Sequence, residues 1–186
     1  MIKKIVCVSL AMASFSLSAA IKPYPNDYVY FSLGNVGFDT PDFGETSIQP
    51  SFGLGWGHNF SQHFAIEGLF RYSESEIDNS VDNAEISLSY YTFGLSGLAS
   101  TGPLFDTPFS LYGRASGLYT IASLYSDGAR DGNESGVLFN IGGGLHWDIG
   151  DNFWVKGEYL ISVADTGLSN FYNSYDGIQL SIGKNF

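Results

Sequence analysis

The last ten residues of the chain alternate between two kinds of side chain, with Lys184 as the exception on the apolar parity. Ile178, Leu180, Ile182 and Phe186 fall on one parity, and the other parity within 177–183 holds only glycine, glutamine and serine. Because successive side chains of a β-strand point to opposite faces, this pattern predicts a strand with one apolar face and one small, polar face. The strand is expected to run to the final Phe186.

The same alternation recurs along the chain and predicts eight strands. The expected strands are 28–37, 48–57, 64–73, 86–98, 109–119, 137–147, 153–162 and 177–186. After residue 20, no run approaches the roughly 18 continuous apolar residues of a membrane-spanning helix. The 23 glycines, the many aromatic residues and the short alternating segments favour an all-β chain.

The fourth predicted strand has an irregular pattern. Its Leu88 and Tyr90 fall out of phase with Phe93 and Leu95. A β-bulge near Tyr90–Tyr91 would bring all four side chains to the same face. We therefore expect a bulge there.

The first 20 residues have the pattern of a secretory signal peptide. Lys3 and Lys4 precede an apolar run at 5–15, and Ser18 and Ala20 occupy the small-residue positions of a cleavage site. The apolar run is shorter than the span of about 20 residues that crosses a bilayer as a helix. We expect cleavage after Ala20, which divides the chain into a signal peptide, 1–20, and one domain, 21–186.

Composition excludes several function classes. The sole cysteine, Cys7, lies in the expected signal peptide, so the mature domain would have neither disulfides nor thiol chemistry. The formal net charge is −11, and removal of Lys3 and Lys4 makes the chain more acidic still. Such a chain is a poor ligand for nucleic acid.

The closing strand resembles that of bacterial outer-membrane β-barrels. In that class, a terminal aromatic residue preceded by alternating apolar residues is the assembly signal, here Phe186 with Ile182, Leu180 and Ile178. Lys184 stands where the class usually has tyrosine or an aliphatic residue. The resemblance implies a Gram-negative bacterium, recognition by the barrel-assembly machinery, and a site in the outer membrane among lipid and lipopolysaccharide.

The connections fit such a barrel with both termini in the periplasm. Connections at 37–47, 74–85, 121–134 and 163–175 are long and polar, and those at 58–63, 99–108 and 148–152 are shorter. A soluble lipocalin-like barrel also alternates, but its outer face would carry many charged residues. Here the second face is mostly glycine and serine, which fit a narrow eight-stranded interior. We therefore predict an all-β fold: an eight-stranded antiparallel up-and-down transmembrane β-barrel with short periplasmic turns and long extracellular loops.

Aromatic residues are expected to form two girdles where the barrel meets the membrane surfaces. The periplasmic girdle would hold Trp56, Phe60, Phe64, Trp147, Phe153 and Trp154, and the outer one Tyr28, Tyr72, Tyr90, Tyr91 and Tyr175.

Three motifs resemble the transmembrane domain of outer membrane protein A. They are Ala65-Ile66-Glu67-Gly68, Tyr112-Gly113-Arg114 and Val155-Lys156-Gly157-Glu158-Tyr159. In that family, charged residues at these places point into the barrel and pair there. The family's second interior pair is missing, since Ser96 and His146 lie near the positions of a lysine and a glutamate.

Strand parity places Glu67, Arg71, Arg114, Lys156 and Glu158 inside the barrel. Glu67 and Lys156 lie at the same height above the periplasmic edge on strands that face each other. We predict that they approach each other, directly or with Arg114 or Arg71 between them, and that Glu158 completes the network.

Enzymatic chemistry has little support in the sequence. Paired carboxylates need a substrate cavity between them, and an eight-stranded barrel has little room. Outer-membrane lipid A deacylases carry a His-x-Ser motif near the chain end, but no histidine follows His146. His58 and His63 flank a predicted turn and lack a third metal ligand. No catalytic residue, cofactor or structural metal is expected.

The long connections are acidic. Their carboxylates are Asp39, Asp42, Glu45, Glu74, Glu76, Asp78, Asp82, Glu85, Asp127, Asp131, Glu134, Asp165 and Asp176. They suit solvated turns, or recruitment of divalent cations at the anionic outer leaflet. The favoured function is a non-enzymatic structural or surface-interaction role, and the protein is expected to be a monomer. The alternatives are a narrow porin-like channel for small solutes and a lipid-modifying outer-membrane enzyme.

Overall fold

The computed structural model describes residues 26–40, 44–45, 49–78, 85–126, 129–166 and 174–186. These residues form the strands β1 (Asp27–Thr40), β2 (Gly44–Glu45), β3 (Gln49–Asn59), β4 (Phe64–Asp78), β5 (Glu85–Ser100), β6 (Phe109–Ser126), β7 (Ala129–Gly150), β8 (Phe153–Thr166) and β9 (Ser174–Asn185). Within the described ranges, no helix is long and apolar enough to cross a membrane.

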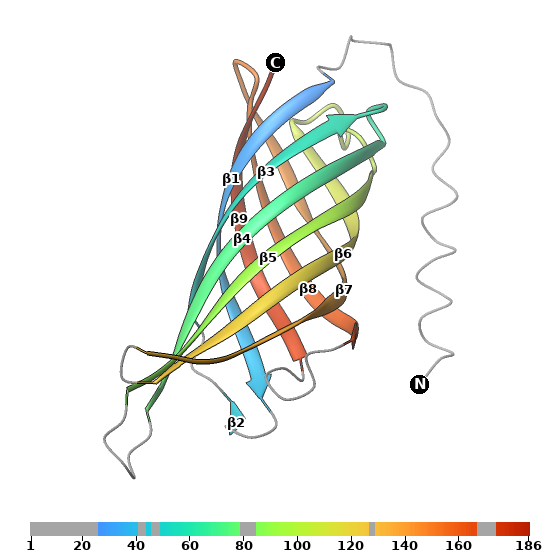
Figure 1. The fold of residues 1–186 in the computed structure, drawn as a ribbon. Coiled ribbons are helices and arrows are strands. Elements are labelled where there is room, and N and C mark those ends of the chain that lie inside the picture. The colour runs from blue at the N-terminus through green and yellow to red at the C-terminus, as the bar shows by residue number, and fades with distance from the viewer. Residues whose placement is uncertain (1–25, 41–43, 46–48, 79–84, 127–128, 167–173) are drawn as a thin grey trace.

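The sheet closes on itself. Each long strand pairs antiparallel with the next, and β1 pairs with β9, with Phe31 opposite Ile182. The two-residue β2 pairs only with the end of β1 and lies outside the wall (Figure 1). The predicted eight-stranded antiparallel barrel is therefore confirmed. Closure satisfies the hydrogen bonds of every wall strand, which a lipid environment requires.

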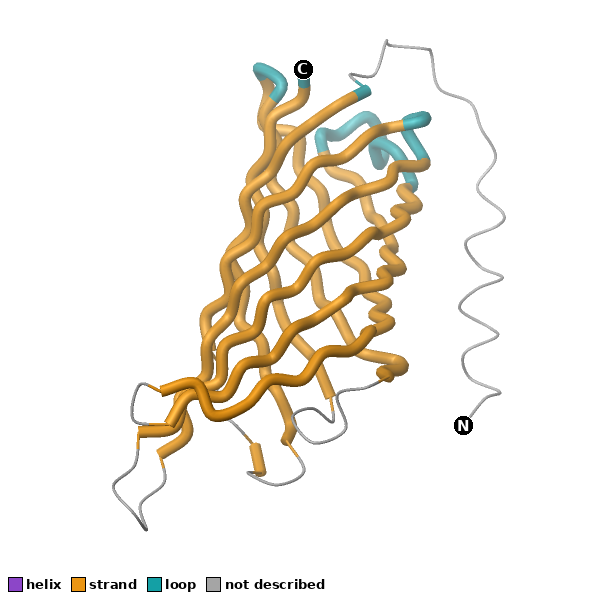
Figure 2. Tube along the Cα trace, viewed as in Figure 1, coloured by secondary structure: helices purple, strands orange, loops and turns teal. Residues whose placement is uncertain are grey.

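Short turns gather at the end of the barrel where the C-terminus lies (Figure 2). The tightest of them has Asp151 and Asn152 between β7 and β8, with φ angles of 52° and 67°. Two residues with positive φ are typical of hairpin turns whose twist matches that of the strands. This end is the periplasmic side of the barrel.

The opposite end carries a protruding sheet. It consists of residues 74–78 of β4, 85–89 of β5, 120–126 of β6 and 129–136 of β7. Figure 1 shows these strand ends reaching beyond the rest of the wall. The connection predicted at 121–134 is thus strand at 121–126 and 129–134, and that at 74–85 is strand at 74–78 and 85. Alternation within a single segment could not reveal this.

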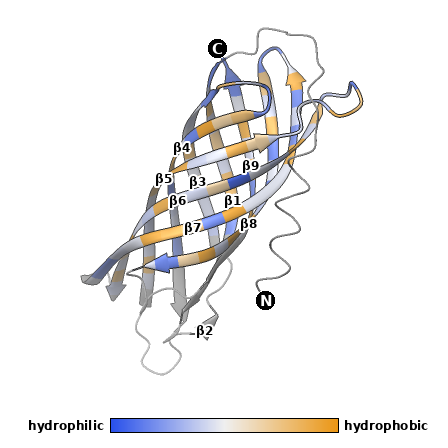
Figure 3. Ribbon diagram, turned by 90° about the vertical axis from the view of Figure 1, so that its right-hand side faces the viewer, coloured by the Kyte–Doolittle hydropathy of each residue, from blue (hydrophilic) through white to orange (hydrophobic). Residues whose placement is uncertain are grey.

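Apolar side chains cover the outside of the wall. The exposed set includes Val29, Phe31, Leu33, Leu54, Phe93, Leu95, Ile141, Ile178, Leu180 and Ile182. Apolar and polar positions alternate along the strands in Figure 3. In an aqueous protein this surface would be unfavourable, whereas lipid accommodates it at no cost.

The bulge predicted near Tyr90–Tyr91 is absent, because the register of β5 with β4 and β6 is continuous. Leu88 and Tyr90 point into the lumen, whereas Phe93 and Leu95 face lipid, so the two pairs of side chains do not share a face. The register shifts lie instead at Leu124/Tyr125, Phe139/Asn140 and Asp148/Gly150.

The girdle assignment fails for Trp154, Tyr28 and Tyr90, which are all buried in the lumen. Tyr28 also lies at the periplasmic end, opposite Asn185. Trp56, Phe60, Phe64, Trp147 and Phe153 are exposed near the short turns as expected, and Tyr91 is exposed on β5. The side chain of Tyr175 and the expected signal peptide lie outside the described part.

Candidate functional site

A cluster of five charged side chains occupies the lumen, and two carboxylates organise it. Glu67 accepts hydrogen bonds from Arg114 Nη2 at 2.6 Å and from Lys156 Nζ at 2.7 Å. Glu158 accepts one from Arg114 Nε at 2.7 Å. Arg114 therefore bridges both carboxylates, and Lys156 contacts Glu67 directly.

Three neutral side chains complete this charged cluster, and one of them connects it to Arg71. Tyr28 donates its hydroxyl to Glu67 at 2.6 Å, and Tyr112 donates to Glu158 at 3.1 Å. Gln179 donates to Glu158 at 2.9 Å and accepts a hydrogen bond from Arg71 Nη2. All five charged residues are buried. Buried charges are tolerated when they are paired and hydrogen-bonded. Glu67, Glu158, Arg114 and Lys156 form ion pairs here, and Arg71 is hydrogen-bonded to Gln179.

Tyr28, Tyr112 and Gln179 are not among the residues predicted for this cluster, and Tyr28 was expected in the outer girdle. Gln179 lies on the inward parity of the closing strand, and Tyr112 precedes Arg114 by two residues on β6. Parity alone would have placed both in the lumen with the charges. What parity could not supply is the height at which each side chain meets the cluster.

Aromatic rings fill the lumen on the periplasmic side of the charges. Tyr28 and Trp154 pack edge to face with ring centroids 5.4 Å apart, and Tyr30 lies 6.0 Å from Trp154. Lys156 Nζ lies 4.3 Å from the centroid of the Trp154 ring, a cation–π contact. The indole NH of Trp154 donates to Asn185 Oδ1 at 3.2 Å.

Glycines on neighbouring strands make room for these rings. A Cβ at Gly55 would overlap the ring of Tyr30, one at Gly57 the ring of Tyr28, and one at Gly183 the ring of Trp154. The small face seen in the sequence is therefore the complement of the large inward aromatic residues.

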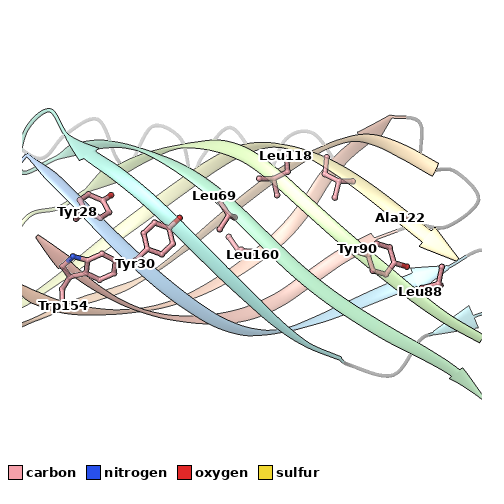
Figure 4. Packing of buried hydrophobic residues seen from close by; sticks show 10 residues of the cluster. Tyr28, Tyr30, Leu69, Leu88, Tyr90, Leu118, Ala122, Trp154 and Leu160 are labelled. Atoms are coloured by element: carbon pink, nitrogen blue, oxygen red, sulfur yellow. The ribbon is translucent and has the colours of Figure 1, made fainter. Parts of the chain in front are cut away.

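Beyond the charges, toward the protruding sheet, a cluster of apolar side chains enters the lumen. The apolar segment consists of Leu69, Leu88, Tyr90, Leu118, Ala122, Leu138 and Leu160, all buried and in one cluster with the aromatic end (Figure 4). On β4, β6 and β8 the leucine follows the charged residue by two to four positions. The lumen thus holds ion pairs in one part. In the next part it holds leucines and Tyr90, interleaved with small buried polar side chains such as Thr92, Thr120 and Asn140.

Ser96 and His146 lie where the resembling family would have its second interior ion pair, and each contacts a near neighbour instead. Ser96 Oγ lies 2.8 Å from Ser116 Oγ, and the His146 ring lies 5.4 Å from the Trp154 ring. Neither residue joins the ion pairs.

His58 and His63 are not brought together. His58 Nδ1 lies 2.9 Å from Asp27 Oδ1, and His63 Nδ1 donates to the Ser100 carbonyl at 3.0 Å. In the described part of the chain, no group of three or more potential ligands could hold a metal ion.

The acidic residues of the outer end are only partly described. Glu74 is exposed and accepts a hydrogen bond from the Tyr72 hydroxyl at 2.7 Å, and Asp165 is exposed at the end of β8. Glu134 lies on the part of β7 that protrudes. The other acidic side chains of the long connections lie outside the described set.

The residues of the expected assembly signal lie on the outer wall. Ile178, Leu180 and Ile182 are exposed to the lipid side, and Phe186 is 65% exposed. The Phe186 NH donates to the Asp27 carbonyl at 3.0 Å, which ties the end of the chain to β1. Lys184 Nζ lies 5.1 Å from the ring of Phe153.

Comparison with solved structures supports the architecture. The Ail protein of Yersinia pestis, crystallised with the heparin analogue sucrose octasulfate, is 16% identical, with a TM-score of 0.61 over 88% of this chain and all of Ail. Neisserial surface protein A is 13% identical, with a TM-score of 0.65 over 86% of this chain and 97% of its own. A major outer membrane protein of Thermus thermophilus is 10% identical, with a TM-score of 0.52 over 85% and 99% of the two chains.

At such identities these likenesses show the fold alone. No curated protein matches the sequence. The model of the outer membrane protein beta-barrel domain family matches residues 6–186, nearly the whole chain. This chain therefore belongs to the outer membrane protein beta-barrel domain family and is an outer-membrane protein.

Proposed function

We propose that this protein is a non-enzymatic surface-interaction barrel, which uses its protruding sheet to bind extended, positively charged polypeptide segments outside the cell. The observation that carries the proposal is the edge of β7. Residues 129–136 pair with β6, whereas pairing with β8 begins only at Val137. Among the described residues, no strand pairs with the other side of this segment.

An unpaired edge is a template for another strand. Its free NH and carbonyl groups can hydrogen-bond an incoming extended segment, and side-chain pockets or charges then select the partner. Residues 74–78 of β4 form a second such edge, because pairing with β3 ends at Ser73. Both edges lie on the part of the barrel that extends past the wall.

Charge suggests what kind of segment would pair there. The sequence from 74 to 85 contains five carboxylates and no base, and the connection from 121 to 134 has Arg130 as its only base. Acidic surfaces favour basic partners and speed their association. Ail was crystallised with a polysulfated ligand; the acidic sequence here favours the opposite charge.

The lumen gives less support to the two other candidates. A channel needs a continuous wet path, but leucine and tyrosine side chains fill the apolar segment. An acid–base enzyme needs a carboxylate that can reach substrate, and Glu67 and Glu158 are both buried and engaged in several hydrogen bonds.

Binding of two synthetic peptides to the folded protein in lipid nanodiscs tests the proposal. One peptide alternates lysine and valine, and the other has the same charge but carries prolines that prevent strand pairing. We expect the first to bind about tenfold more tightly than the second. A barrel in which an Asn-Gly turn joins Ser123 directly to Asn133, two residues paired in register, keeps only 133–136 of the β7 edge and should lose most of that preference.

Equal binding of both peptides would show attraction by charge without strand addition and would contradict the proposal. The trimmed barrel serves as the matched control, because it keeps the wall and the charged cluster and loses, from the apolar packing of the lumen, only Leu124. Retention of the full preference by the trimmed barrel would contradict strand addition at the edge of β7.

A further inference from the structure

A pocket opens at the periplasmic end of the lumen, opposite the protruding sheet. Its volume is about 50 Å³, and its lining includes Tyr112, Trp154 and Lys156. A water molecule needs roughly 10–15 Å³ on this scale, so the pocket accommodates several waters or one small polyatomic ion.

Three donor side chains form a row across this pocket. Ser110 of β6 lies directly opposite His146 of β7, and His146 lies directly opposite Lys156 of β8. All three line the pocket. Since side chains of directly opposed residues are about 4.5–5.5 Å apart at Cβ, the row presents a hydroxyl, an imidazole and an ammonium to one space.

The donors of this row are only partly used. Among the described residues, Lys156 Nζ donates to one oxygen, Glu67 Oε1 at 2.7 Å, and its remaining surroundings are the rings of Trp154, Tyr28 and Tyr112 at 4.3, 5.0 and 5.5 Å. An ammonium has three hydrogens to donate. Within the same described ranges, no side-chain hydrogen bond is recorded for Ser110 or His146.

The lining of the pocket carries no negative charge. Among the described lining residues, Lys156 is the only one with a formal charge, and none is an aspartate or a glutamate. The charged cluster behind it has three bases, Arg71, Arg114 and Lys156, against two carboxylates, Glu67 and Glu158. The formal charge of these five residues is therefore +1.

We infer that this pocket binds a small oxyanion that enters from the periplasm, held by Lys156, Ser110 and His146. The ligand class is a phosphate, sulfate or carboxylate group, whose oxygens accept from several donors at once. Charge-assisted hydrogen bonds to such oxygens are the strong ones, and the surrounding rings exclude competing water. This site lies at the other end of the barrel from the protruding sheet and does not depend on the proposed function.

Titration of the folded, isotope-labelled barrel with inorganic phosphate tests the inference. The readouts are the amide signals of Ser110 and Lys156 and the indole NH of Trp154. Parallel titrations with sulfate and acetate identify which oxyanion the pocket prefers. We expect saturable shifts confined to the pocket residues.

Two pairs of variants test the residues. Ser110→Asp adds a negative charge without touching the ion pairs, and we expect it to weaken binding about tenfold, whereas Ser110→Asn should bind like wild type. Lys156→Gln should also weaken binding about tenfold. Lys184→Gln is its control, since Lys184 is exposed on the outer wall of the same end.

Each variant is first shown to be folded by its heat-dependent mobility in SDS. Absence of saturable binding by the wild type overturns the inference. Equal affinities of Ser110→Asp, Lys156→Gln and wild type overturn it as well, because the anion would then bind elsewhere.

Discussion

Different interactions hold the side chains in the two halves of the lumen. The periplasmic half holds buried ion pairs around Glu67 and Glu158, capped by aromatic rings, and the outer half holds the leucines and Tyr90 of the apolar segment. Ion pairs tolerate no missing partner, because a lone buried charge has no solvent to replace it. Hydrocarbon packing is less specific, and its losses scale with the cavity that remains. One narrow barrel can therefore be closed in two independent ways.

The largest expected effect is the removal of one member of the charged cluster. Glu67→Ala leaves Lys156, Arg114 and Tyr28 without their shared acceptor. We expect a loss of about 3–5 kcal/mol in the free energy of unfolding, measured by urea titration in detergent micelles or bilayers.

A double-mutant cycle checks that pairing causes this loss. Glu67→Ala with Lys156→Ala should recover part of it, because the second change removes a charge left unpaired by the first. Strictly additive losses would mean that the two side chains do not interact energetically.

The next effect is expected in the apolar segment. Leu118→Ala creates a cavity in the lumen and should cost about 2–5 kcal/mol by the same unfolding measurement. Leu95→Ala is the matched control on the neighbouring strand, because Leu95 is 63% exposed toward lipid whereas Leu118 is 2% exposed. Equal losses for both variants would contradict an apolar, tightly packed outer lumen.

A smaller effect is expected from filling the space beside an aromatic ring. Gly183→Ala would push its Cβ into the ring of Trp154, and overpacking of this kind costs about 1–3 kcal/mol. Gly97→Ala meets no atom within 4 Å on the outer wall and should change stability little. Thermal unfolding of Gly183→Ala and Gly97→Ala compares the two stabilities, and their difference measures how rigidly Trp154 is held. Equal melting temperatures would show that the indole moves aside freely.

The smallest expected effect is on conductance. Glu67→Ala with Lys156→Ala opens the charged half alone, and the apolar segment still blocks the path. Planar-bilayer recording should therefore show no more current than wild type, since hydrophobic constrictions exclude water and ions. A clear rise in conductance would show that the ion pairs alone close the barrel.

Much of this molecule could be predicted from alternation. Period-two patterning placed Glu67, Arg71, Arg114, Lys156 and Glu158 inside, and the structure has all five there. Lys156 was predicted to approach Glu67, and its Nζ lies 2.7 Å from Glu67 Oε1. Arg114 contacts both Glu67 and Glu158. Grouping aromatic residues by their distance from the turns was less sound, because it ignored the parity that places Trp154 on the face of Lys156.

The sequence by itself determined the fold class, the number of wall strands and the face on which each charge lies. These depend on local chemistry, since each strand reports its own two faces. Only the tertiary structure decided which residues meet across the lumen, that Leu88 and Tyr90 are interior, and how far β4 to β7 extend beyond the wall. Those features depend on strand tilt, stagger and cross-strand register, which arise only when the whole sheet closes.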